Sequence, residues 1–343
     1  PLRGPAARVS RTHMTRIAAI LAIFILLMNG RHLVMRAEIP PAAMAVAASP
    51  IDPGDLAALG ARPGEPHYLG GWSLKASHPF FGGLSALHIT DDGFVTGLSD
   101  TGQLATFRAG LPRSPGRWAP LPALPGKDRE ASYWDTESMT MDPASGRIWV
   151  GFEMRNRICR FNAAFAAMEH CAFPPAMASW PQTKGIESLA RLPDGRFLAI
   201  GENAPAPHGG HDMLLWAGDP VESATPPPIH LEYHPPLGYL PTDAIAIGPD
   251  RLLVMNRRVT IRDGFIGAVT LVDISDLTPG RILTGKTVLS LSAPRPHDNF
   301  EGLAMSRENG VPILWIVSDD NRLFFQRTLL LKFAMPPQWF GAK

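Results

Sequence analysis

One segment recurs five times along this chain and constrains its fold more than any other feature. Residues 83–100 read GLSALHITDDGFVTGLSD and residues 185–202 read GIESLARLPDGRFLAIGE, and the two segments align without a gap. Three further copies end at Glu153, Arg257 and Asp319, and the five copies are spaced by 52, 50, 56 and 58 residues. The aligned starts of the copies are Ser85, Glu137, Glu187, Asp243 and Glu301. Periods near 50 residues are typical of β-propellers and solenoids.

Each copy predicts a β-hairpin followed by one or two further strands. A small and apolar strand leads to a turn built on Asp-Gly, Ser-Gly or Asn-Gly, and a strongly β-forming run such as RFLAIG follows. Third strands such as QLATFRA or DMLLWAG come next, and the fourth strands include 230–234 and 287–291. Four strands per repeat predict a β-propeller blade, so we expect an all-β fold. The repeat count gives five blades, and the Pro-rich spans 110–128 and 172–183 leave room for a sixth.

The last repeat lacks a fourth strand, whereas residues 68–75 (YLGGWSLK) form a predicted strand with no repeat of its own. We expect this N-terminal strand to complete the last blade and close the ring, which removes exposed sheet edges. The predicted propeller therefore spans residues 66–335. A Pro/Ala-rich linker is expected over 37–65, and a short tail over 336–343.

The first 36 residues resemble an export signal. Residues 17–28 are uncharged and apolar, and they are shorter than the roughly 20 residues of a membrane-spanning helix. Arg3, Arg8, Arg11 and Arg16 precede this run, although Arg31 and Arg36 follow it. We expect a signal peptide or a signal anchor, and hence a periplasmic or secreted protein that residues 17–28 could hold at the inner membrane. Small-residue sites at 43–45 and 45–47 leave cleavage and retention both open, and a buried core helix is the alternative.

The charge balance and the motifs limit which partners and enzyme classes the sequence supports. Against 32 Lys and Arg stand 31 Asp and Glu, so the net charge of +1 argues against nucleic acid as a partner. The sequence contains no GxSxG, HExxH, Walker or GxGxxG motif, which removes support for lipase, zincin, nucleotide-hydrolysing and Rossmann functions. We expect the protein to act on a small molecule and to be a monomer.

The two cysteines, Cys159 and Cys171, flank a predicted hairpin. An oxidising compartment would allow them to form a disulfide across adjacent strands. Two unpaired buried thiols are the alternative. No spacing of cysteines and histidines suggests a zinc site.

The repeat places two rings of side chains at the central channel, because the first strand of each blade lines it. One ring holds the five aligned starts given above. The second ring, at the ends of the second strands, is predicted to comprise Asp100, Glu153, Glu202, Arg257 and Asp319. Eight of these ten residues are acidic, and such crowding raises pKa values or requires a cation. Ca²⁺ is the natural counter-ion for carboxylate oxygens.

These rings supply the candidate site. The predicted metal ligands are Glu137, Glu187, Asp243, Glu301 and Asp319. The predicted catalytic residues are Glu187, Glu301, Glu202 and Arg257, with the arginine as a clamp for a phosphate or carboxylate group. Alternatively, acidic residues at strand ends cap backbone N–H groups or pair with arginines. The loop containing His208, His211 and Asp212, and the segment 297–299, are weaker candidates.

Five motifs in order carry a family resemblance: GGLSAL at 82–87, DTESM at 135–139, GIESLARLPDG at 185–195, PTDAIAI with LLVMNR over 241–257, and FEGLAM with WIVSDDN over 300–321. Over roughly 67–335 the chain resembles the phytase-like domain described as having esterase-like activity of phytase. The resemblance implies an exported β-propeller that hydrolyses phosphate or carboxylic esters. A catalytically silent propeller that binds a partner or glycan at the cell envelope is the alternative function.

Overall fold

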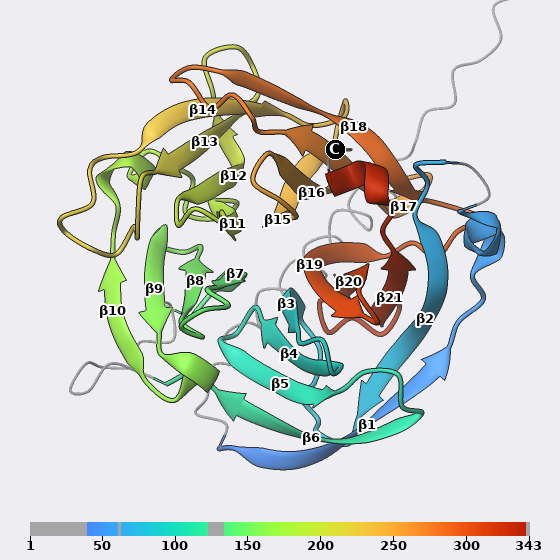
Figure 1. Cartoon of the computed structure of the whole chain (residues 1–343). Helices are drawn as coiled ribbons and strands as arrows, with labels where there is room; N and C mark the ends of the chain where they lie inside the picture. The colour runs from blue at the N-terminus through green and yellow to red at the C-terminus, as the bar shows by residue number, and fades with distance from the viewer. Residues whose placement is uncertain (1–39, 61–62, 123–133, 341–343) are drawn as a thin grey trace, which may run out of the picture. The chain divides into compact units, whose positions relative to one another are not determined.

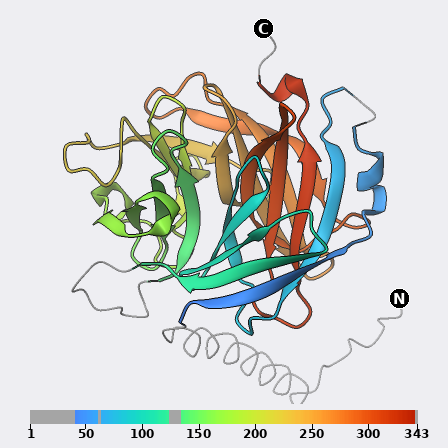
Figure 2. The same cartoon turned by 60° about the horizontal axis from the view of Figure 1, so that its bottom comes forward.

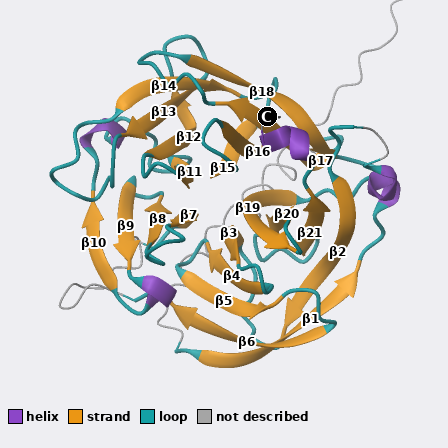
Figure 3. Cartoon of the chain, viewed as in Figure 1, coloured by secondary structure: helices purple, strands orange, loops and turns teal. Residues whose placement is uncertain are grey.

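A computed structural model describes residues 40–60, 63–122 and 134–340 of the chain. The predicted export signal over residues 1–36 lies outside these ranges. Within them, no helix is long and apolar enough to cross a bilayer. Strands dominate the described residues, and the helical segments are short 3₁₀ turns (Figure 3). These turns are η1 (Gly54–Ala58), η3 (Ala163–Phe165), η4 (Pro175–Met177) and η5 (Pro337–Phe340).

The described strands form five antiparallel groups of four around a common centre (Figure 1). Blade one contains β3 (Leu84–Ile89), β4 (Phe94–Ser99), β5 (Gln103–Arg108) and β6 (Arg113–Pro120). Blade two contains β7 (Thr136–Met141), β8 (Ile148–Phe152), β9 (Arg157–Phe161) and β10 (Met168–Ala172). Blade three contains β11 (Ile186–Arg191), β12 (Phe197–Pro205), β13 (His211–Trp216) and β14 (Ile229–His234). Blade four contains β15 (Leu240–Ala246), β16 (Arg251–Thr260), β17 (Gly264–Asp273) and β18 (Ile282–Leu291).

Blade five closes the ring with a strand from the N-terminal side. It contains β19 (Asn299–Glu308), β20 (Val311–Asp319), β21 (Thr328–Ala334) and β2 (His67–Ala76), and β2 pairs antiparallel with β21. The first strands of successive blades contact one another, and β19 contacts β3. The predicted β-propeller and its closure by an N-terminal strand are therefore confirmed.

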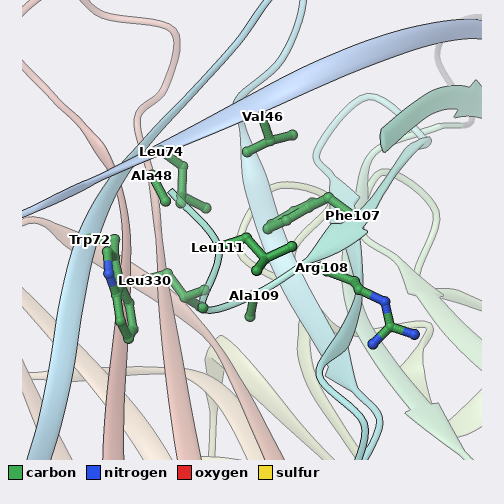
Figure 4. Close-up of a pocket in the computed structure, with 10 residues that line it drawn as sticks. Val46, Ala48, Trp72, Leu74, Phe107, Arg108, Ala109, Leu111 and Leu330 are labelled. Atoms are coloured by element: carbon green, nitrogen blue, oxygen red, sulfur yellow. The ribbon is translucent and has the colours of Figure 1, made fainter. Parts of the chain in front are cut away.

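The linker expected over residues 37–65 is in part a strand. Strand β1 (Ala42–Pro50) pairs antiparallel with β2 on one side and with β6 on the other, so it joins blades five and one (Figure 1). Small residues suggested a linker, but Met44 and Val46 alternate with less buried neighbours and bury their side chains. Val46 lines a small apolar pocket with Trp72, Leu74 and Phe107 (Figure 4).

The core lies between neighbouring blades. Trp149 of β8 packs edge-on against Phe197 of β12, with ring centroids 4.9 Å apart. Trp315 of β20 stacks on Trp72 of β2 within blade five. Aromatic rings therefore pack both between neighbouring blades and within one blade. A disulfide joins Cys159 to Cys171, which are paired residues of β9 and β10.

Strand direction divides the ring into two faces (Figure 2). Strands alternate in direction within each blade. The starts of the first strands, the ends of the second strands and the links between blades consequently lie at one face, which we call the mouth face. The end of β21 and η5 lie at the opposite face (Figure 2).

Candidate functional site

A β-bulge occurs at the same place in every blade. The register between first and second strands shifts by one residue at the start of each first strand, as between Thr136 and Ser138 or between Ile186 and Ser188. Bulges re-aim a side chain and are frequent beside active sites. The residues left over by the five shifts are Ser85, Glu137, Glu187, Thr242 and Glu301. Four of these five are members of the first predicted ring.

Asp243 corrects the prediction for the first ring. In blade four the bulge lies between Pro241 and Asp243, so Thr242 occupies the position of Glu187, and Asp243 stands one residue further along. The Asp243 carboxylate accepts hydrogen bonds from the backbone N–H groups of Ala244 at 2.7 Å and Leu303 at 2.6 Å. Asp243 therefore caps backbone donors, which is the alternative that the sequence left open.

Arg257 connects carboxylates of two other blades. Its guanidinium donates to Glu202 of blade three at 2.6 Å, to Glu301 of blade five, and to Asn299 at 2.8 Å. Burial alone would lower the pKa of Arg257, but the charges of Glu301 and Glu202 outweigh burial and raise it. The arginine is therefore permanently charged and already holds two carboxylates. Lys184 approaches the other oxygen of Glu202 at 3.0 Å.

The carboxylates of blade two form a second group. The ligand oxygens of Asp135, Glu137 and Glu153 all lie within 4.8 Å of one another. Glu153 also accepts hydrogen bonds from the backbone N–H groups of Lys184 and Gly185. These bonds hold the Glu153 side chain at the seam between blades two and three.

Burial and mutual repulsion make these carboxyls weak acids. Burial, and next the charge of Glu187, raises the pKa of Glu137 well above its ordinary value. Burial, and next Glu202 and Glu153, does the same to the pKa of Glu187. Burial, and next the charge of Asp135, raises the pKa of Glu153. Such groups either retain protons near neutral pH or bind a cation.

Asp319 and Asp100 lie at the other side of the same channel. Burial, and next the charges of Glu301 and Asp100, raises the pKa of Asp319 well above its ordinary value. Asp100 forms an ion pair with Arg322 at 3.2 Å, and Asp319 accepts a hydrogen bond from the backbone of Asn321 at 2.6 Å. The structure thus brings the carboxylates of the second ring to one channel mouth, where arginines compensate part of their charge.

Several residues at the mouth were not predicted from the sequence. Asp135 and Lys184 lie close to repeat positions that were singled out, so proximity to those positions was the only signal for them. Glu232 was not predicted at all. Its buried carboxylate accepts hydrogen bonds from His208 at 3.0 Å, from His234 at 2.6 Å and from Gly210, and so it fixes the loop between β12 and β13. The His208 loop is thereby held in place by a carboxylate of the fourth strand, β14.

Comparison with solved structures yields distant similarities. The chain is 13% identical to a calcium-binding protein, regucalcin, from Agrobacterium tumefaciens, with a TM-score of 0.46, covering 79% of this chain and 90% of that one. It is 12% identical to a putative oxidoreductase (glucose dehydrogenase) from Thermus thermophilus, with a TM-score of 0.43, covering 74% of this chain and 98% of that one. The β-propeller domain of Cps50 (Swd1) from Myceliophthora thermophila is 9% identical, with a TM-score of 0.36 and coverage of 77% and 76%.

A search of curated proteins gave no match. A family model does match, and it covers residues 79–322, which include all five repeats and every carboxylate of the mouth described above. The chain therefore belongs to the phytase-like family, described as having esterase-like activity of phytase.

Proposed function

We propose that this chain is a metal-assisted hydrolase of phosphate or carboxylic esters that acts at the mouth of its channel. The observation that supports the proposal is the group of Asp135, Glu137 and Glu153, whose carboxylate oxygens lie within 4.8 Å of one another. Oxygens bound to one Ca²⁺ at 2.3–2.6 Å can lie at most about 5 Å apart. One ion could therefore be reached by all three carboxylates.

The donor chemistry also fits a hard cation. Carboxylate oxygens are the ligands that Ca²⁺ prefers, and three of them supply the charge that a divalent ion requires. A bound ion would polarise the ester and lower the pKa of an attacking water. Asp135 and Glu153 join the ligand set in place of Asp243, because both Asp243 oxygens accept backbone hydrogen bonds, whereas the backbone donors at Glu153 share one of its two oxygens.

Glu187 is the candidate acid and base of the reaction. Glu187 is buried, and its carboxyl forms a hydrogen bond with Glu153 of the proposed ligand group. Burial raises the pKa of Glu187, which suits a group that must exchange a proton near neutral pH. We assign to Glu187 the transfer of the proton to or from the ester oxygen.

Arg257 and its partners supply the positive charge of the site. The guanidinium is fixed by Glu202 and Glu301. It forms ion pairs with both carboxylates, and it presents the charge that an anionic substrate group needs at a mouth rich in carboxylates. Lys184 lies beside Glu202 and adds a second cation.

We also propose that the protein is exported. The cysteines support this, because Cys159 and Cys171 are bonded across β9 and β10, and disulfides persist in oxidising compartments. Protein recovered from the cell envelope is expected to resist alkylation at both cysteines until it is reduced. Free alkylation of both thiols without reduction, measured by mass spectrometry, would contradict export.

The experiment that tests the hydrolase proposal compares ester turnover with and without metal. Purified protein is assayed on 4-nitrophenyl phosphate and on 4-nitrophenyl acetate, with Ca²⁺ and with chelator. We expect turnover of one ester that requires the metal and falls at least tenfold in Glu137→Gln and Glu187→Gln. The matched control is Asp194→Asn, which removes an exposed carboxylate at the opposite face and should leave turnover unchanged.

Two outcomes would contradict the proposal. Turnover that persists in chelator and in both variants would place the chemistry elsewhere. Absence of turnover on both ester classes, together with absence of any Ca²⁺ binding, would favour a propeller that binds a partner without catalysis.

A further inference from the structure

The most exposed large apolar side chains of the described residues share one face of the ring. Leu237, Ile261 and Phe324 are 95%, 109% and 98% exposed, whereas the exposed large apolar residues on the opposite face reach at most 45%. Val259, Phe173 and Phe325 are also more than half exposed. All six lie in links between blades, or at the connections between second and third strands, and therefore at the mouth face. Isolated exposed apolar residues are ordinary, but this segregation is not.

The opposite face provides the contrast. The other exposed large apolar residues are only 39–45% exposed, and they lie at or near its turns: Leu69, Phe94, Leu111, Ile282 and Val311. A large apolar side chain that is more than half covered contributes to the packing of its own blade. Leu237, Ile261 and Phe324 are almost fully solvated, and Phe324 contacts the ring of Phe325, which is itself exposed. Packing within the fold therefore does not explain these three side chains.

Cationic side chains flank these apolar residues. Arg327 follows the pair Phe324 and Phe325, and Arg262 follows Ile261 at the tip between β16 and β17. The side chains of Arg262 and Arg327 are 94% and 48% exposed. Most of the mouth carboxylates are buried, namely Asp100, Glu153, Glu187, Glu202, Glu301 and Asp319, whereas Asp135 and Glu137 are half-buried. The loops of the mouth face therefore present apolar and positively charged side chains at the surface.

We propose that the mouth face docks on the surface of an anionic lipid bilayer. Leu237, Ile261 and Phe324 would enter the boundary between head groups and acyl chains, and the flanking arginines would meet lipid phosphates. The apolar residues sit on separate loops, each nearly fully solvated. A fluid bilayer accepts such separate side chains, whereas the core of a protein interface is one closely packed patch. This surface does not depend on whether the site hydrolyses an ester.

A depth-sensitive probe tests the proposal on the full chain. Both native cysteines are in the disulfide, so Phe324→Cys introduces a thiol that can be labelled alone. An environment-sensitive fluorophore at this position should shift to shorter wavelength and become protected from iodide on vesicles that contain phosphatidylglycerol. The matched probe at Val311→Cys, on the opposite face, should stay accessible. Residues 17–28 could hold either labelled protein on a vesicle, but they cannot make the two positions differ in this way.

A second comparison measures affinity. A probe is placed at residue 325, and Leu237, Ile261 and Phe324 are replaced together by Ser. The lipid concentration at which the probe penetrates such vesicles should rise at least tenfold, because each buried side chain contributes roughly tenfold or more to the binding affinity. The control replaces Phe94, Leu111 and Val311 by Ser at the opposite face and should change it less than twofold. Equal iodide access at residues 324 and 311 on bound protein, unaltered penetration by the triple variant, or absence of vesicle binding would each overturn the proposal.

Discussion

At the scale of single residues, the mouth carboxylates divide by what they face. Glu202 faces two cations, Arg257 and Lys184. Asp243 faces two backbone N–H groups, which offset only part of the effect of burial, so its pKa is still raised well above the ordinary value. Glu137 and Glu187 face other carboxyls, and burial with this repulsion raises the pKa of each. Folding with the carboxyls of Glu137 and Glu187 ionised costs free energy unless a proton or a cation is bound. A metal would therefore stabilise the protein most at these residues.

A thermal melt tests this difference. In millimolar Ca²⁺ the wild-type chain is expected to melt several degrees higher than in chelator, because a bound ion stabilises the folded state by mass action. The double variant Glu137→Gln and Glu153→Gln should lose that shift. In chelator it should melt at or above the wild type, since removal of repelling buried carboxylates is favourable. A double variant that keeps the Ca²⁺ shift would exclude this metal site.

Glu232 gives a pH dependence of the opposite kind. Burial alone would raise the pKa of Glu232, but hydrogen bonds from Gly210, His208 and His234 outweigh burial and lower it to about 2. The folded state therefore prefers the ionised carboxylate, and its stabilisation is complete above the unfolded pKa of about 4.3 and is lost as the pH falls toward 2. Wild type should lose on the order of 2 kcal/mol more than Glu232→Gln between pH 5 and pH 2. Parallel curves of unfolding free energy against pH would refute this role.

At the scale of elements, the bulge and the bridging strand matter most. The bulge decides which residue of each first strand is left over at the mouth, and in blade four it selects Thr242 instead of Asp243. Strand β1 pairs with β2 of blade five and with β6 of blade one, and it buries the side chains of Met44 and Val46. Neither feature changes the number of strands in a repeat. The bulge changes which side chain lies at the mouth face, and β1 joins two blades.

Strand β1 can be tested by a pair of substitutions on its two faces. Val46→Asp places a charge at a side chain that is 1% exposed and should lower stability by about 3 kcal/mol or more. Ala47→Asp, on the exposed face of the same strand, should change stability by less than about 1 kcal/mol. Chemical denaturation measures both. Equal effects would mean that β1 does not pack as described.

At the scale of the whole molecule, Arg257 ties blades together. It originates in blade four and holds Glu202 of blade three and Glu301 of blade five, so one side chain links three of the blades that surround the channel. Glu202 is fully buried, so loss of Arg257 would leave a buried carboxylate without its main cation.

The matched pair Arg257→Ala and Arg258→Ala tests this link. Arg257→Ala leaves Glu202 and Glu301 without their main cation and should lower stability by about 3–5 kcal/mol. Arg258 instead lies over the ring of Tyr239, and its removal should cost about 1 kcal/mol. Denaturant titration of both variants measures the difference. A similar small loss in both would show that Arg257 does not hold the blades.

The repeat by itself determined the propeller, because spacing, turn residues and alternating apolar strands are local properties that any copy displays. It also determined ring closure, since residues 68–75 are a strand with no blade of their own and the last blade lacks one. Composition misled at residues 42–50, where small residues suggested a linker. Whether such residues form a strand depends on what lies beside them, here β2 and β6.

The candidate site, too, could be predicted only in part from the sequence. Glu137, Glu187 and Glu301 could be predicted because equivalent positions of a closed ring converge on its axis. Asp243 could not be placed, because a one-residue bulge is invisible in an ungapped alignment of repeats and reverses the side of the strand on which a residue lies. The partners of Arg257 come from other blades. Only the tertiary structure decided those contacts, since they depend on distances across the ring that no local pattern encodes.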